Sequence, residues 1–261
     1  MKKETLRALK KLVTSFKEKR GIFKEVHANK IYLFPKGSRE EILLWLLYSI
    51  SIDYGVNAIP LFSRLSSLFE KNKSLFRPEY ILQLDRKKLR EIFRKEIRHR
   101  FPNAAAEKWI SVSRYLMEKY NGEIEKLFES KDAKKIWQEV RNIKGFGPKL
   151  ASLFLAFVKR LNLVELKEIE DIPVPVDTHL EKLALRIGII EKPINREELG
   201  KIWNLIAKKL GESWLDLNDA LWITGAFLCR KKRCQICDLK EVCKKCILLP
   251  EKQTDRAPGG I

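Results

Sequence analysis

The stretch NIKGFGPKLASLFL, residues 142–155, decides the fold of this chain. Gly145 and Gly147 stand one residue apart, Pro148 follows, and Lys149 opens an apolar run. Glycine tolerates the positive φ that a tight turn between helices needs, and Phe146 between the two glycines can plug the turn into a core. Proline suits the first position of a helix, where its missing N–H costs little. The stretch therefore predicts a helix-hairpin-helix.

Such a turn presents free backbone N–H groups at a helix N-terminus, where a phosphate oxygen can bind. The spacing is not that of a Walker loop, which also needs Ser or Thr after its lysine. A G-x-G turn can equally do no more than join two helices. Gly145, Phe146 and Gly147 are candidate residues for binding a phosphate group of a partner. The turn alone leaves open whether Lys149 binds phosphate or carries out chemistry.

The charge balance favours a polyanionic partner. The 261 residues include 53 Lys and Arg against 34 Asp and Glu, a net charge of +19, with 45% hydrophobic residues. The hydrophobic content indicates a globular protein. The basic excess predicts binding to nucleic acid first and to an acidic membrane surface second. A charge-rich thermophilic surface would explain the number of charges but not their one-sided balance.

The chain shows no targeting or membrane segment. Residues 1–21 form a basic amphipathic pattern without the apolar run of a signal peptide. The longest uncharged run, residues 42–52, has eleven residues and is too short to span a bilayer. We expect an intracellular protein of the cytoplasm or nucleoid, a monomer with no membrane partner.

Apolar spacing of three and four residues predicts helices along nearly the whole chain. The runs lie at the N-terminus and near 39–54, 59–71, 86–97, 103–120, 132–140, 150–161, 178–187, 195–210 and 215–229. A short β-hairpin is expected over 22–34, where two β-prone runs flank His27 to Asn29. The sequence thus predicts an all-α protein with one short hairpin.

The segment VPVDTHLEKLALRIG, residues 174–188, predicts an extended entry followed by a helix. Thr178 and Glu181 have the spacing of a capping box, and Gly188 suits the helix end. Asp177 then lies just outside the helix start. It is either a functional carboxylate or merely another cap for the helix dipole. His179, in the first turn, is interpreted as structural.

Five cysteines lie between residues 229 and 246. Such a tight cluster indicates a metal site, because secreted disulfide frameworks spread their cysteines along the chain. Four thiolates suit a [4Fe–4S] cluster and also suit zinc. Two ligand sets remain open: Cys229, Cys234, Cys237 and Cys243, or Cys234, Cys237, Cys243 and Cys246. The loop also carries Arg230, Lys231, Lys232 and Arg233, which we expect the metal to hold against a phosphate backbone.

Together, IKGFGPKLA, VDTH and CRKKRCQICDLKEVC resemble, in order, the helix-hairpin-helix DNA glycosylases of the endonuclease III superfamily with a C-terminal iron–sulfur loop. The resemblance spans about 39–246. It implies an all-α, two-lobed fold, with a helical bundle over 36–161 and a second lobe from 1–35 and 162–261, and DNA bound across the cleft between the lobes. It also implies that Lys149 is the nucleophile, that Asp177 faces it and assists, and that the first cysteine set holds a [4Fe–4S] cluster, with zinc as the alternative.

The implied activity is DNA base-excision repair: a glycosylase that flips and removes a damaged base, with AP lyase activity. A carboxylate can stabilise the oxocarbenium character that develops as the base leaves. An amine can attack C1′, form a Schiff base and permit β-elimination. The base must leave the stack, because its C1′ face is hidden in duplex DNA. The implied partner is double-stranded DNA with a damaged base or an abasic site.

The sequence also departs from the family. Its early helix lacks the usual glutamine, so the polar candidates for the base pocket are Ser49, Ser51, Asp53 and Tyr54. The stretch 100–109 lacks the usual Lys-Ala, and the first cysteine gap is two residues shorter. These departures leave the lesion unassigned. They also leave two alternatives open: a monofunctional glycosylase without lyase activity, and a non-catalytic DNA-binding module.

Overall fold

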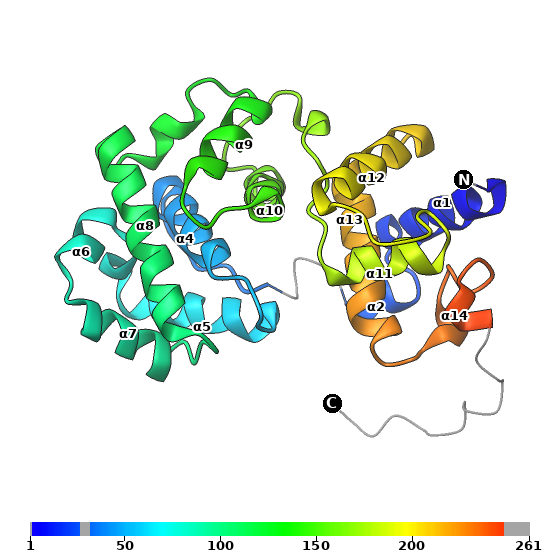
Figure 1. Cartoon of the computed structure of the whole chain (residues 1–261), viewed down its shortest axis with the longest axis horizontal. Helices are drawn as coiled ribbons and strands as arrows, with labels where there is room; N and C mark the ends of the chain where they lie inside the picture. Colours follow the sequence, from blue (N-terminus) through cyan, green and yellow to red (C-terminus); the bar gives the residue numbers. More distant parts are fainter. Residues whose placement is uncertain (1, 27–31, 248–261) are drawn as a thin grey trace. The chain divides into compact units, whose positions relative to one another are not determined.

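The computed structural model of the chain describes residues 2–26 and 32–247 (Figure 1). The chain divides into two compact units. The bundle unit comprises 28–175 and 200–204, and the Cys-loop unit comprises 1–27, 176–199 and 205–261. The segment 162–175, expected in the second lobe, groups with the bundle, where the Val174 N–H donates to the Gly200 carbonyl at 3.3 Å.

The bundle unit is built from helices whose apolar faces meet around α4. In chain order its helices are α4 (Arg39–Ser51), α5 (Ala58–Lys71), α6 (Pro78–Gln83), α7 (Arg86–Lys95), α8 (Pro102–Tyr120), α9 (Ala133–Asn142) and α10 (Pro148–Arg160). Ser38 and Glu41 begin α4 with a reciprocal capping box. Helix α4 is buried from Ile42 to Ser51 and packs against α5, α8 and α10. This central helix is therefore a rigid support for the turn that follows it.

Aromatic side chains fill the bundle core. Trp109 on α8 is fully buried, and its ring lies 4.9 Å from that of Tyr48 and 4.8 Å from that of Phe93. Its indole N–H donates to the Tyr48 carbonyl at 3.0 Å, so this polar group is satisfied. Packing of this kind ties α4, α7 and α8 together.

The Cys-loop unit is also helical. Its helices are α1 (Lys3–Lys17), α2 (Ile22–Glu25), α11 (Thr178–Arg186), both ends of α12 (Arg196–Leu210), α13 (Trp214–Ile223), a π-helix (Thr224–Cys229) and α14 (Lys244–Ile247). The middle of α12, residues 200–204, groups with the bundle unit. Helix α1 packs against α13, and α11 packs against α13 and the π-helix. In the described part of the chain, no helix combines the length and hydrophobicity needed to cross a membrane.

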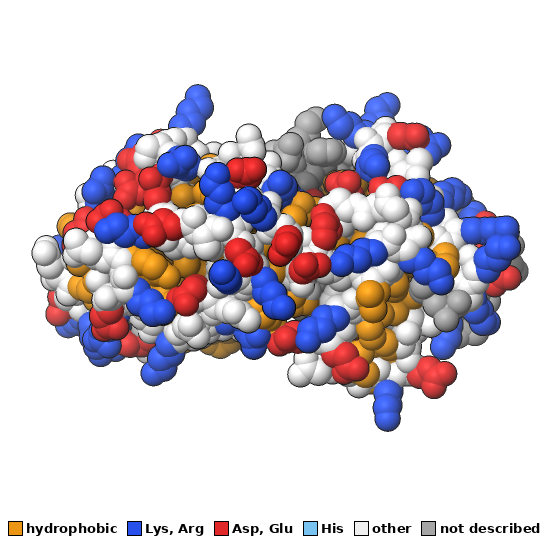
Figure 2. Space-filling model, turned by 90° about the horizontal axis from the view of Figure 1, so that it is seen from above, with side chains coloured by type: hydrophobic (Ala, Val, Ile, Leu, Met, Phe, Trp, Pro, Cys, Tyr) orange, Lys and Arg blue, Asp and Glu red, His pale blue; other side chains and the backbone are white. Residues whose placement is uncertain are grey.

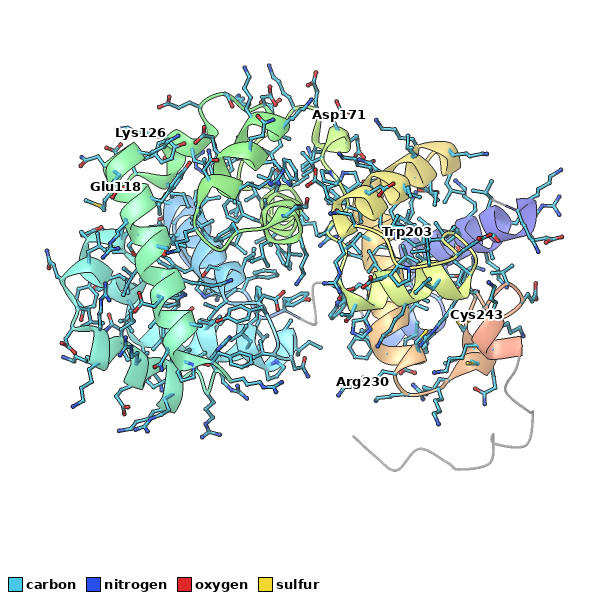
Figure 3. The ribbon with its side chains drawn as sticks, in the orientation of Figure 1. Glu118, Lys126, Asp171, Trp203, Arg230 and Cys243 are labelled. Atoms are coloured by element: carbon cyan, nitrogen blue, oxygen red, sulfur yellow. The ribbon has the colours of Figure 1, made fainter. Side chains whose placement is uncertain are left out.

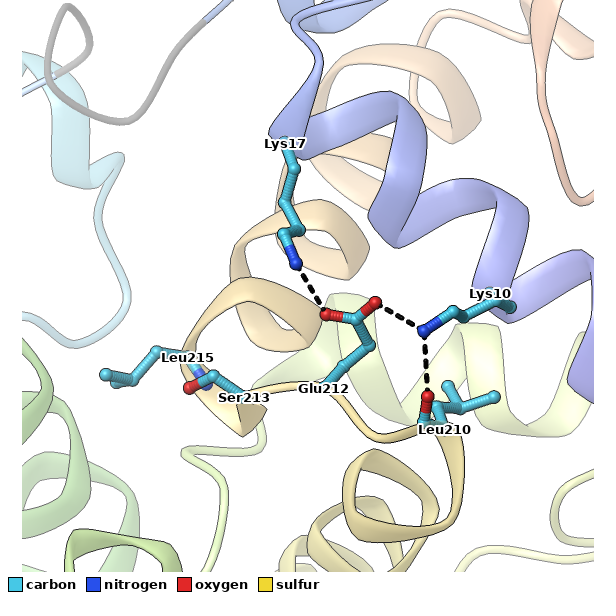
Figure 4. Close-up of polar contacts among 6 residues, drawn as sticks. All are labelled: Lys10, Lys17, Leu210, Glu212, Ser213 and Leu215. Carbon is cyan, nitrogen blue, oxygen red and sulfur yellow. Dashed lines mark hydrogen bonds and ion pairs between the residues drawn. The ribbon is translucent and has the colours of Figure 1, made fainter.

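A nearly buried carboxylate fastens α1 to the turn between α12 and α13 (Figure 4). Glu212 lies 2.7 Å from Lys10 Nζ and 3.0 Å from Lys17 Nζ, with its side chain only 6% exposed. Burial raises the pKa of Glu212, but the hydrogen bonds and charges of the two lysines outweigh burial and hold that pKa below its usual value. The N-terminal helix is thus an integral part of this unit.

The expected hairpin over 22–34 is wrong in its described part. Ile22 and Phe23, assigned to the first strand, lie in α2 with their side chains buried. Residues 32–34 form no strand, and the expected tip, 27–31, lies outside the described residues. Ile22 and Phe23 favour β-strands locally, but burial of their side chains in the unit outweighs that preference and places them in a helical turn. The expected all-α fold is confirmed.

Candidate active site

The hairpin lies between α9 and α10, which pack against each other. Gly145 has φ +95°, which strains any residue with a side chain, and a Cβ there would also crowd Lys108 Cε at 3.2 Å, so glycine is strongly favoured. Phe146 is 6% exposed and plugs the turn into the core as expected. Gly147 differs from the expectation: its φ is −94°, a value open to any residue, and no atom lies within 4 Å of a Cβ built there. Gly147 therefore leaves open space beside the helix start.

Two backbone N–H groups at this turn have no acceptor within the part of the chain that the structure describes. Leu150 and Ala151 donate to the Gly147 carbonyl at 3.1 and 3.2 Å, and Phe146 donates to Ile143 at 2.9 Å. Within the described residues, the N–H groups of Gly147 and Lys149 make no such bond. Unpaired N–H groups at the positive end of a 13-residue helix can receive a phosphate oxygen.

Lys149 is the second residue of α10, and its side chain ends on the turn after α4. Its Nζ lies 2.9 Å from Asp53 Oδ2 and 3.4 Å from the Asp53 carbonyl oxygen. The Lys149 side chain is 31% exposed and that of Asp53 is 11% exposed. The amine is therefore reachable from solvent but held on one side by a mostly buried carboxylate.

A second lysine, Lys108 on α8, lies beside this pair. Its Nζ is 4.2 Å from the centroid of the Tyr54 ring and donates to the Gly145 carbonyl at 3.2 Å. Burial, and then the charge of Lys149, lower the pKa of Lys108, while Asp53 acts in the opposite direction. Burial raises the pKa of Tyr54. Two cations and one carboxylate thus form a single charged cluster against the hairpin.

The expected base-pocket residues separate into two groups. Asp53 and Tyr54 contact Lys149 and Lys108, as described above. Ser49 and Ser51 are fully buried within α4, and the Ser51 hydroxyl donates to the Tyr48 carbonyl at 2.6 Å. The two serines therefore belong to the bundle core and present no surface to a flipped base.

Asp177 is the N-cap of α11. Its Oδ1 accepts hydrogen bonds from the N–H groups of His179 at 2.8 Å and Leu180 at 3.0 Å. The expected capping box at Thr178 is therefore wrong by one position, and Glu181 instead pairs with Arg196 at 2.9 Å. Both described hydrogen bonds use Oδ1, so Oδ2 retains its acceptor capacity. Lys149 belongs to the bundle unit and Asp177 to the Cys-loop unit.

The π-helix fixes the position of the first turn of α11. A Cβ at Gly225 would lie 2.6 Å from His179 Cβ, closer than real side chains approach. His179 is therefore packed against the backbone of Gly225, in agreement with its structural interpretation.

Gly225→Ala is expected to lower the free energy of unfolding by about 1–3 kcal/mol, because α11 must move to admit the methyl group. Chemical denaturation followed by circular dichroism measures the change. Glu165→Ala, at an exposed side chain, is the control and is expected to change the free energy of unfolding by no more than about 0.5 kcal/mol. Equal stability of the Gly225 variant and the wild type would contradict the close packing.

The five cysteines run from Cys229, the last residue of the π-helix, to Cys246 in α14. Burial raises the pKa of Cys237 to about 12, with smaller contributions from the neighbouring thiols. The pKa of Cys246 is raised by burial and then by hydrogen bonds with Cys234 and Cys243. In residues 2–26 and 32–247, no three His, Cys, Asp or Glu side chains converge as a metal site. The thiols are thus neighbours, although they do not converge with metal-ligand geometry.

The basic residues of this loop face solvent. Arg230, Lys231 and Lys232 are exposed and Arg233 is half-buried. Arg230 and Cys243 are labelled in Figure 3, one just after the π-helix and the other just before α14. Across the face shown in Figure 2, basic side chains are interspersed with acidic ones, so the positive charge on this face is not gathered in one patch.

The helical units and the hairpin define the class of structure: the chain has the fold of endonuclease III. Two solved endonuclease III–DNA complexes, one a trapped covalent intermediate and one non-covalent, superpose with a TM-score of 0.66 each. Their sequences are 18% and 19% identical to this chain. Each superposition covers 95% of this chain, and 98% and 97% of the two endonuclease III chains. A thermostable thymine-DNA glycosylase superposes with a TM-score of 0.63 at 17% sequence identity. The superposition covers 94% of this chain and 98% of that glycosylase.

A sequence relative gives a second comparison. A protein of Methanocaldococcus jannaschii, provisionally named a DNA repair glycosylase, is 26% identical over 175 residues, which are 66% of this chain and 73% of that protein. No family model matches the chain.

Proposed function

We propose that the chain is a DNA base-excision repair glycosylase with AP lyase activity. It removes a damaged base from double-stranded DNA and cleaves the resulting abasic site through Lys149. The observation that carries this proposal is the position of Lys149. Its amine is partly exposed at the start of α10, beside unpaired hairpin N–H groups, in a chain with the fold of endonuclease III. The name of the M. jannaschii relative and the net charge of +19 support the same function.

In this proposal Lys149 is the nucleophile. The Lys149 ammonium first loses a proton to solvent, and the neutral amine then bonds to C1′ while the bond from C1′ to the base breaks. The new C1′–N ammonium gives up a proton, and the departing base takes up a proton. Opening of the sugar ring gives a Schiff base, loss of a C2′ proton follows, and the C3′–oxygen bond breaks, which nicks the strand. Asp177 assists by placing negative charge near the oxocarbenium-like transition state, for which its Oδ2 is available.

The hairpin and the basic loop are the proposed DNA contacts. The N–H groups of Gly147 and Lys149 would receive a phosphate oxygen, whereas the Phe146 side chain stays in the core and supports the turn between Gly145 and Gly147. The cations of the cysteine loop, the exposed residues 230–232 and the half-buried Arg233, would contact further phosphates.

The test is incubation with duplexes carrying a panel of damaged bases and a plain abasic site, with borohydride added to reduce any imine. A covalent protein–DNA complex on the abasic duplex, together with cleavage of one or more lesions, is the expected result. Alkali-labile sites without a covalent complex would instead identify a monofunctional glycosylase. Binding without any product would identify a DNA-binding module.

We propose that Cys229, Cys234, Cys237 and Cys243 hold a [4Fe–4S] cluster, with zinc as the alternative metal. Their chemistry fits, because four soft thiolates within one short loop suit either metal. When bound, the cluster would provide a structural tether for the loop, which presents Arg230 to Arg233. Cys246 also neighbours Cys234 and Cys243, which leaves open the rival set, in which Cys246 replaces Cys229.

Paired cysteine variants distinguish the two ligand sets. Cys229→Ser is expected to abolish the visible absorbance and the bound iron of the purified protein, whereas Cys246→Ser is expected to keep both. Cys243→Ser, which belongs to both sets, is the positive control for loss. Elemental analysis measures the bound iron and zinc. Absorbance at about 400 nm is recorded in parallel, because an iron–sulfur cluster absorbs there and zinc does not. Loss of the metal in Cys246→Ser and its retention in Cys229→Ser would identify Cys246 as the fourth ligand in place of Cys229.

A further inference from the structure

We infer that Asp53 is a positioning residue for Lys149, with its carboxylate holding the reactive amine at the turn between α4 and α5. The inference rests on the proposed function of Lys149 as the nucleophile. It gives Asp53 a role distinct from contact with the damaged base.

The geometry restricts a side chain that is otherwise mobile. A lysine side chain has many rotamers to lose, and a nucleophile misplaced by about 1 Å can lose about 100-fold in rate. The contacts from Nζ to Asp53 Oδ2 at 2.9 Å and to the Asp53 carbonyl at 3.4 Å fix the end of the Lys149 side chain. Because Asp53 is 11% exposed, solvent screens this pair less than a surface pair.

Asp53 is itself held on a rigid support. Its N–H donates to the Ile50 carbonyl at 3.0 Å, directly after α4, whose residues from Ile42 to Ser51 are all buried. A site anchored to a buried helix keeps its geometry better than one on a free loop. The carboxylate therefore has a defined position before any substrate arrives.

The neighbouring Lys108 increases the need for the Asp53 carboxylate beside Lys149. Its ammonium lies over Tyr54 and donates to the Gly145 carbonyl, so two lysines from α8 and α10 approach the same turn. Asp53 is the carboxylate that acts on both amines. Without it, the two lysine charges would repel each other with no carboxylate between them, and this repulsion would favour displacement of Lys149 from its position.

Three variants of Asp53 test the role in DNA cleavage. Asp53→Ala is expected to lower the single-turnover rate on an abasic duplex by about 10–100-fold, with affinity for a stable abasic analogue changed by less than about threefold. Asp53→Glu, which keeps the charge, is expected to recover part of the rate, and Asp53→Asn, which keeps the shape, is expected to recover less. Glu165→Gln is the matched control, because Glu165 pairs with Lys131 at 2.9 Å on the surface of the same unit. A wild-type rate in Asp53→Ala would overturn the role.

A second measurement needs no DNA and no activity. The rate at which Lys149 is acetylated by an amine-specific reagent is followed by mass spectrometry in the wild type and in Asp53→Asn. Release of the ammonium from its carboxylate is expected to raise that rate at least about threefold, whereas Lys131 in the same samples is expected to stay unchanged. Equal Lys149 rates would show that Asp53 does not hold the amine. If the wild type forms no covalent complex with DNA, the proposed function fails, and the acetylation rates still decide whether Asp53 holds Lys149.

Discussion

Lys149→Arg is expected to abolish the borohydride-trapped complex and to reduce abasic-site cleavage about 1000-fold or more. Arginine keeps a positive charge at the start of α10 and can still pair with Asp53. It does not supply a nucleophilic amine, because the guanidinium stays protonated. The change therefore removes the chemistry while it keeps the charge, which Lys149→Ala does not.

Arginine also tests the alternative role of Lys149. A lysine that only binds phosphate is replaced well by arginine, which contacts phosphates through two N–H groups. Retention of the trapped complex in Lys149→Arg would therefore contradict the Schiff-base proposal. Lys131→Arg, on a surface lysine paired with Glu165, is the control for the general effect of the substitution. Gel electrophoresis of the reduced reactions measures the complex, and DNA affinity is measured in parallel.

The helices were largely predictable because they are long and amphipathic. The expected run at 103–120 corresponds to α8 (Pro102–Tyr120), and that at 195–210 corresponds to α12 (Arg196–Leu210). Helix α6 has only six residues, too few to show a period, and was not predicted. The π-helix after α13 was predicted as ordinary helix, because its different hydrogen-bond register leaves no mark in apolar spacing.

The contacts of the candidate site were less predictable than its members. Lys149 and Asp53 were both singled out, but as a nucleophile and a base-pocket residue, because 96 residues separate them and no local pattern reports a tertiary ion pair. Lys108 was missed for the same reason: its partner Gly145 lies 37 residues away. A lysine among the apolar residues of a helix is an ordinary amphipathic feature, so the sequence offered no signal for it.

Asp177→Asn is expected to lower the single-turnover rate of base excision by about 100-fold to 10,000-fold while leaving the fold intact. Asparagine caps helices as well as aspartate does, and its side-chain oxygen can accept the bonds from His179 and Leu180. The substitution therefore removes the charge at this position and keeps the cap.

The two roles of Asp177 are separated by a second variant at the same position. Asp177→Ala removes both cap and charge, and is expected to lose about 1 kcal/mol of stability in addition to activity. If Asp177 serves only as a cap, Asp177→Asn keeps the wild-type rate and the wild-type free energy of unfolding, whereas Asp177→Ala is destabilised. If the carboxylate stabilises the developing positive charge, Asn is as inactive as Ala while keeping wild-type stability. Since the cap uses Oδ1 alone, the second oxygen can serve the reaction without any loss to α11.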